Sequence, residues 1–210
     1  MRGALAGYNY NELVDKAHIG LWFDRYLEEQ ALGEGGYNAS LLRECSRINE
    51  PELYAAFFAR WVKELDRLGV RPHTAEVIYR LAAGHGGESV IETGIRLHHT
   101  YVVPIIPGSS LKGVAASFAH RVLGGDNGWK KGSEAYNAFF GTTAESGCVT
   151  FFDALPLPGK WELLPDVLTV HHPDYYTGSG SAPADWDSPN PVSFLAASGT
   201  FLIGLGASDK

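Results

Sequence analysis

The chain has 210 residues, of which 45% are hydrophobic and 20% charged, a balance typical of a globular protein and not of a disordered one. This length has room for one domain, or for one domain with an appendage. The formal net charge of −7 argues against a protein that coats nucleic acid indiscriminately, because such binding needs an excess of Lys and Arg.

Cysteine usage and hydropathy indicate the compartment. The two cysteines, Cys45 and Cys148, allow neither a disulfide framework nor a Cys-x-x-Cys metal site. No apolar run approaches the ~18 residues of a membrane span, and the apolar start of the chain is too short for a signal peptide. We therefore expect a cytoplasmic protein with no membrane partner.

The first part of the chain reads as helical. Apolar residues recur every three to four positions from Asn11 to about Ala31 and again from Leu53 to Leu68, which predicts two amphipathic helices. Pro51 stands just before the second helix, and Gly69 is a candidate for its C-cap. After Pro72 the period changes and predicts a β-strand over Ala75–Leu81, with Val77, Tyr79 and Leu81 on one face.

The rest of the chain alternates between extended and helical patterns. We expect an irregular extended segment over 93–103, a helix over 109–123, a short helix over 136–140, strands over 148–152, 163–170, 192–197 and 200–205, and a disordered stretch over 175–191. These elements predict an α+β fold with helices on one face of a mostly antiparallel sheet.

Charge is distributed unevenly along the sequence. Residues 71–125 hold five Lys and Arg against three Glu, a local charge of +2, whereas the segments on either side are acidic. The same stretch has five of the eight histidines. An anionic ligand is therefore expected to bind there.

The run from Pro104 to Gly113 is the most informative part of that stretch. Gly108 allows a tight turn, and Ser109 or Ser110 can cap the following helix. The N-terminus of a helix attracts anions, and Lys112 adds a full charge in its first turn. The order of Lys112 and Gly113 excludes a Walker A loop. A phosphate site and an ordinary capped helix with a surface lysine explain these residues equally well.

Several motifs in order carry a family resemblance. The Pro104–Gly113 run is one of them, and the others are Leu97-His98-His99-Thr100-Tyr101, Phe139-Phe140-Gly141, Val149 to Ala154, Asp166 to His172, Tyr175-Tyr176 and Asn190 to Leu195. Together they resemble the RAMP superfamily of CRISPR RNA-binding proteins, in particular the subunits of type III-B Cmr effector complexes.

The resemblance implies a domain organisation. Residues 1–72 would form an N-terminal helical region, and residues 73–210 a ferredoxin-like (RAMP/RRM-like) RNA-binding domain with an antiparallel sheet. A flexible insertion at about 175–191 would project as a thumb beside the guide–target duplex. The usual second helix and glycine-rich loop at the C-terminus of such domains are not found in this sequence.

The resemblance also implies a function. The chain would be a non-catalytic structural subunit, without cofactor or metal, that binds the CRISPR guide RNA near its 3′ end and caps the backbone of the ribonucleoprotein complex in antiviral defence. Its partners would be guide RNA, target RNA, and the backbone and first subunits. Expected RNA-binding residues are Arg80, Arg96, His98, Gly108, Ser109, Ser110, Lys112, Gly113, Arg121, Tyr175 and Tyr176.

Other functions stay open at this point. A histidine among His98, His99, His171 and His172 could act as general base in a metal-independent RAMP endoribonuclease. Neighbouring residues on a strand point to opposite faces, so a metal site would need residues from both histidine pairs plus a carboxylate such as Asp153 or Asp166. A third reading is a shortened copy that engages the complex without holding RNA.

Overall fold

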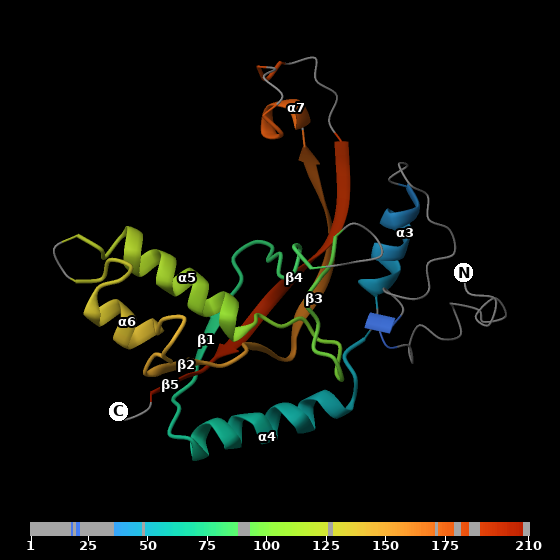
Figure 1. Ribbon diagram of the computed structural model, residues 1–210. Coiled ribbons are helices and arrows are strands. Elements are labelled where there is room, and N and C mark those ends of the chain that lie inside the picture. The colour runs from blue at the N-terminus through green and yellow to red at the C-terminus, as the bar shows by residue number, and fades with distance from the viewer. Residues whose placement is uncertain are drawn as a thin grey trace. The chain divides into compact units, whose positions relative to one another are not determined.

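The computed structural model describes residues 18, 20–21, 36–47, 49–87, 93–125, 128–170, 172–178, 182–184 and 190–207 (Figure 1). Within the whole chain, two compact units are assembled from alternating stretches of sequence. The first comprises residues 1–49, 78–102 and 162–198, and the second residues 50–77, 103–161 and 199–210. The predicted division at residue 72 stays a prediction. Most of the predicted helix over Asn11–Ala31 lies outside the described residues.

Helix α4, Leu53–Arg67, confirms the second predicted helix and anchors the core of the second unit. Leu65, Val70 and Leu202 form that core, with partly buried hydrophobic side chains packed against them: Phe58, Trp61, Val62, Phe152 and Leu157. The C-cap is Leu68, one residue before the predicted Gly69, and Gly69 follows it with a φ of 72°, a conformation that favours glycine just after a helix. The hydroxyl of Tyr54 donates a 2.6 Å hydrogen bond to the carbonyl of Pro156 and is buried.

Strand β1, His73–Glu76, pairs antiparallel with the end of β4, Asn190–Ile203, so that His73 faces Ile203. The predicted strand over Ala75–Leu81 is wrong beyond Val77. Val77 bonds to Gly199 and Leu81 pairs with Ala197, so residues 78–80 stand opposite a single residue of β4. The segment bulges out of the ladder, and this displaces Tyr79 from the face predicted for it.

Helices α5, Gly108–Arg121, and α6, Glu134–Phe140, confirm both helices predicted after residue 104. They lie beside one another and α5 contacts β2, Val149–Phe151 (Figure 1). Strand β2 pairs antiparallel with β5, Leu205–Ala207, and confirms the strand predicted over 148–152. Aromatic rings fill the space between α6 and β2, where the Phe140 and Phe151 rings stack with centroids 6.2 Å apart.

Strand β3, Leu155–Val170, begins eight residues before the predicted strand. The three-stranded sheet has the order β1-β4-β3, so β3 is an edge strand. Edge strands tolerate proline because one side of the strand makes no ladder bonds, which can account for Pro156 and Pro158, two residues apart on the same side of β3. The two strands predicted over 192–205 are instead one strand, β4, followed by the short β5.

The first unit contains helix α3, Gly36–Cys45, which the sequence pattern did not predict. Its side chains Leu41, Leu42 and Cys45 are buried. The parts of β3 and β4 in this unit run side by side in opposite directions and carry α7, Pro173–Tyr176, at their end (Figure 1). Most of the predicted 175–191 insertion lies outside the described residues.

The architecture is the predicted mixture of α-helices with antiparallel sheets. Among the described residues no helix is long and apolar enough to cross a membrane.

Candidate RNA-binding site

The start of α5 is held against the backbone at the end of β2. A Cβ atom on Gly108 would lie 2.1 Å from the carbonyl oxygen of Phe151, a separation that side chains do not adopt. Gly108 is buried and therefore has to be glycine for this contact. Its N–H donates a 2.7 Å hydrogen bond to Oδ1 of Asp153, so a carboxylate stands at the positive end of the helix dipole.

The expected serine cap is wrong. The N-cap residue is Pro107, which has no side-chain donor or acceptor, and Ser109 and Ser110 both lie inside the first turn of α5. The carbonyl of Pro107 accepts the N–H of Ser110 at 2.9 Å and that of Leu111 at 3.1 Å. Asp153, which lies far from this loop in sequence, supplies the side-chain bond that a serine was expected to supply.

The polar residues of the first turn face different directions. An α-helix advances by about 100° per residue, which puts Lys112 about 60° from Ser109 and about 160° from Ser110 around the axis. Both serines are exposed, and Lys112 is half-buried. One phosphate at this end of α5 can therefore meet Ser109 and Lys112 together, whereas Ser110 faces away from Lys112.

The two remaining predicted residues of α5 lie further along it. Gly113 is exposed, and nothing comes within 4 Å of a Cβ built on it. Arg121 is exposed in the last turn, about 13 Å along the axis from Lys112 at ~1.5 Å per residue. Arg121 also lies about 180° from Lys112 around the axis, so the two side chains face opposite sides of α5 and cannot meet the same phosphate.

Arg80, in the first unit, already has a protein partner. Its Nη1 atom lies 3.1 Å from Oδ1 of Asp166 and donates to the carbonyl of Pro165 at 3.1 Å. These bonds tie the bulged segment to β3. The side chain is 46% exposed, so a phosphate would share the guanidinium with Asp166.

Arg96 is exposed in a segment with tightly packed main chain. Its N–H donates to the carbonyl of Ala83 at 2.7 Å. Gly84 has a φ of 92°, and a Cβ on it would lie 2.8 Å from the Arg96 nitrogen. The backbone under Arg96 is thus fixed while its guanidinium faces solvent.

The histidine pair at 98 and 99 is built into a turn. The Nδ1 atom of His98 accepts the N–H groups of Thr100 at 3.2 Å and Tyr101 at 3.3 Å. The His98 carbonyl accepts the N–H of Val102, whose φ of 50° is rare for a β-branched residue. With Nδ1 as acceptor, the neutral ring carries its proton on Nε2.

Tyr175 and Tyr176 occupy the short helix α7. The two residues are 56% and 73% exposed, and their ring centroids lie 5.7 Å apart in an edge-to-face arrangement. Exposed aromatic rings can stack on bases. His172, just before them, accepts the N–H of Tyr176 through its carbonyl at 3.2 Å, and His171 lies outside the described residues.

A sequence model of the RAMP superfamily matches residues 74–194 of the chain. This range is more than half of the sequence and includes α5, α6, all of β3 and the first five residues of β4. The chain belongs to the RAMP superfamily.

Individual RAMP relatives are similar along most of the chain. The CRISPR system Cmr subunit Cmr6 of Pyrococcus furiosus is 27% identical over 217 residues, covering 76% of this chain and 64% of that protein. A chain in the cryo-EM structure of the Type III-B Cmr-beta bound to cognate target RNA has 22% identity and a TM-score of 0.63, covering 83% of this chain and 60% of that one. The crystal structure of Cmr6 from Pyrococcus furiosus has 27% identity and a TM-score of 0.39, with 67% and 84% covered.

The chain thus spans 64% of the length of its curated RAMP relative. At 22% identity, the likeness to the chain in the cryo-EM structure concerns the fold alone. Among the residues that the structure describes, no three His, Cys, Asp or Glu side chains are grouped so that they could hold a metal ion.

The predicted RNA-binding residues of this RAMP protein fall into two groups. Gly108, Ser109, Ser110, Lys112, Gly113 and Arg121 belong to the second unit, and Arg80, Arg96, His98, Tyr175 and Tyr176 to the first. Sequence reasoning missed the role of Asp153 at the helix start. No local signal could have revealed it, because the bond joins residues 45 positions apart.

Proposed function

We propose that the chain is a non-catalytic, RNA-binding structural subunit of a type III-B CRISPR effector complex. It would cap the backbone of the complex near the 3′ end of the guide RNA, in the cytoplasm, with the backbone and first subunits as neighbours. The observation that carries this proposal is the RAMP match over residues 74–194, together with the 27% identity to Cmr6. The finer fold in this proposal is ferredoxin-like.

In this role α5 binds RNA backbone through its start. Lys112 and Ser109 share one side of the first turn and can approach one phosphate. Arg121 and Arg96 are exposed cations for further phosphates. Contacts of this kind position an RNA strand without reading its sequence, which suits a subunit whose guide differs from one complex to the next.

The tyrosines of α7 supply the other kind of contact in this proposal. Tyr175 and Tyr176 stand at the end of the β3–β4 hairpin and are exposed. Stacking tolerates any base, so these rings would hold either strand of the guide–target pair near the insertion at about 175–191.

The turn at His98 favours a binding role over RNA cleavage. A general base needs an unprotonated nitrogen that can reach the 2′-hydroxyl. In His98 the unprotonated nitrogen, Nδ1, faces two main-chain N–H groups of its own turn. In this tautomer Nε2 carries the proton and cannot accept another.

Co-purification tests the proposal. The tagged chain is recovered from its host, the bound RNA is sequenced and the partner proteins are identified. We expect short RNAs that share a 5′ repeat tag, together with several RAMP subunits. Recovery of the same subunits without RNA would favour the shortened copy, and recovery of the chain alone would refute the proposal.

Two further assays assign the roles of residues. The double variant Lys112→Ala, Arg96→Ala should bind guide RNA more weakly and with a smaller salt dependence, and unchanged binding would remove both residues from the site. Incubation of the wild type with labelled repeat RNA in EDTA should leave the RNA intact. A metal-free cut that is abolished by His98→Ala would establish the endoribonuclease instead.

A further inference from the structure

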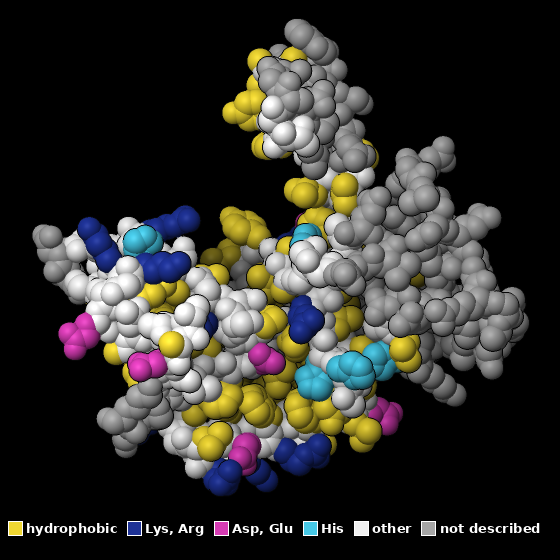
Figure 2. Space-filling model, in the orientation of Figure 1, with side chains coloured by type: hydrophobic (Ala, Val, Ile, Leu, Met, Phe, Trp, Pro, Cys, Tyr) yellow, Lys and Arg dark blue, Asp and Glu magenta, His cyan; other side chains and the backbone are white. Residues whose placement is uncertain are grey.

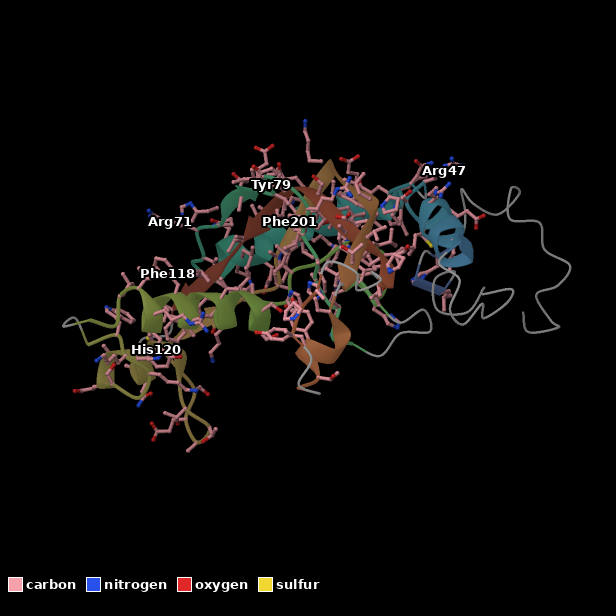
Figure 3. All side chains as sticks on the ribbon, turned by 90° about the horizontal axis from the view of Figure 1, so that it is seen from above. Arg47, Arg71, Tyr79, Phe118, His120 and Phe201 are labelled. Carbon is pink, nitrogen blue, oxygen red and sulfur yellow. The ribbon has the colours of Figure 1, made fainter. Side chains whose placement is uncertain are left out.

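Four basic side chains come together at the C-terminal end of α5. His120 and Arg121 belong to its last turn, Lys130 and Lys131 belong to the loop before α6, and all four are exposed. The N–H of Lys131 donates to Nδ1 of His120 at 3.2 Å and joins the two segments. Figure 2 shows Lys and Arg side chains gathered around one histidine near this end of α5, and Figure 3 labels His120. We call these four residues the basic corner.

The loop of the basic corner is fixed on both sides of its lysines. Ser133 donates its N–H to the carbonyl of Lys130 at 2.9 Å, and its hydroxyl donates to the carbonyl of Gly128. The Trp129 ring packs edge-on against Phe139, with centroids 5.7 Å apart. The backbone that carries the two ammonium groups is therefore ordered before any ligand arrives, which lowers the entropic cost of binding.

The charges of the basic corner stand out in an acidic chain. Ion pairs within the described part of the chain join Arg67 to Glu64 and Arg80 to Asp166, and none of them involves the corner. Asp126, in the same loop, lies outside the described residues. The Nδ1 atom of His120 accepts a hydrogen bond, so its Nε2–H adds a donor to the three cations.

We propose that the basic corner binds the phosphodiester backbone of an RNA strand, at a site separate from the start of α5. This inference rests on the proposed function. The 14 residues of α5 span about 20 Å, so a phosphate at the corner is a different one from a phosphate at Lys112. Lysine is depleted from protein–protein interfaces but is a regular partner of phosphate, so its two copies here favour RNA over an acidic protein surface.

A second explanation of the corner makes a different prediction. Cations near the C-terminus of a helix stabilise its dipole, by about 0.3–1 kcal/mol each, and the N–H of Lys131 is bonded to His120 in the last turn of α5. Removal of such cations would lower the thermal stability of the chain without changing its affinity for RNA. Measurements of RNA binding and of thermal unfolding on the same variants therefore separate the two explanations.

The test compares two double variants of the full chain. Lys130→Gln with Lys131→Gln removes two charges from the corner. Arg60→Gln with Lys63→Gln removes two exposed charges from α4, in the same unit, and is the matched control. Binding of an unstructured oligo-uridine strand is measured between about 50 and 200 mM salt. Each contact with a single-strand phosphate contributes about 0.7 to the steepness of log K against log salt, where K is the binding constant. The corner variant, with two contacts removed, should therefore show a slope that is shallower by about 1.4. The control should keep the wild-type slope.

Each outcome decides one point. A corner variant with the wild-type slope overturns the inference and leaves the proposed function intact, and a lowered melting temperature would then assign the corner to the helix dipole. Equal losses in both double variants would mean a diffuse charge effect and also overturn it. Loss of a co-purifying protein with an unchanged slope would identify an acidic protein as the ligand. A wild type that binds no RNA at any salt refutes the RNA-binding part of the proposed function itself.

Discussion

Replacement of Gly108 by alanine tests the packing that places the start of α5. Judged by helix propensity alone, Gly→Ala in a helix is favourable by up to about 1 kcal/mol. The structure predicts the opposite sign, because the new Cβ would meet the Phe151 carbonyl oxygen at 2.1 Å and backbone on both sides would have to move. Overpacking of this kind costs about 1–3 kcal/mol.

The displacement also weakens the bond between the Gly108 N–H and Asp153. Since Asp153 is exposed, we count about 1 kcal/mol for this bond, below the range of about 1.5–3 kcal/mol for hydrogen bonds to charged groups. The total of about 2–4 kcal/mol corresponds to a fall in melting temperature of about 10 °C at this chain length. The matched control is Gly113→Ala in the same helix, where a Cβ meets nothing within 4 Å.

Thermal unfolding followed by circular dichroism measures both variants. Gly113→Ala should raise the melting temperature by about 3 °C, since alanine is about 1 kcal/mol better than glycine in an exposed helix position. A Gly108→Ala protein as stable as the wild type would refute the close approach of α5 to β2. Similar losses in both variants would refute the argument from local geometry.

Three other predictions concern charge, stacking and burial. Asp153→Asn keeps an acceptor for the α5 start but removes a negative charge there. RNA should therefore bind about two- to fivefold more tightly at low salt, which corresponds to about 0.3–1 kcal/mol. Weaker binding would contradict a phosphate at this end of the helix. Tyr176→Ala should weaken RNA binding by about 1–3 kcal/mol with an unchanged salt slope, and a changed slope would speak against stacking. Burial, and to a lesser degree the charge of Glu44, raises the pKa of the Cys45 thiol from 9.0 to about 12. The unfolded chain therefore releases this proton first, so the stability that Cys45 contributes is complete below about pH 9 and is lost as the pH rises toward 12, by about 1.4 kcal/mol per pH unit. Urea unfolding at about pH 8 and about pH 10 should show this loss in the wild type and not in Cys45→Val.

Elements with a clear apolar periodicity and with glycine at their ends were predictable from the sequence. The α4 helix has an apolar stripe that ends at Gly69, and α5 is bracketed by Gly108 and Gly124. The beginning of β3 was not predictable in this way, because its prolines argue against a strand until the edge position is known. The bulge after Val77 was hidden for a related reason, since it depends on which residues of β4 stand opposite.

The candidate site was predictable in its residue types and less so in its geometry. The sequence left a phosphate site and an ordinary capped helix open at Lys112, and the helix begins at Gly108, as both interpretations require. The side-chain acceptor at its start is a carboxylate from beyond β2 and not a neighbouring serine. A phosphate that approaches Lys112 therefore meets a resident negative charge, which lowers its affinity for this end of the helix and makes contacts elsewhere on the RNA more important.

Local charge illustrates why sequence segments are a poor guide to binding surfaces. Counted along the chain, Arg121 belongs to a stretch of net charge +2, while Lys130 and Lys131 fall in the strongly acidic remainder. In the folded chain these lysines lie near the end of α5, where the N–H of Lys131 donates a hydrogen bond to His120. Coulomb interactions with a bound strand decay within about 10 Å at 0.1 M salt, so a phosphate responds to this corner and not to the overall charge of −7. A protein of acidic composition can therefore hold RNA wherever its fold gathers cations within that distance.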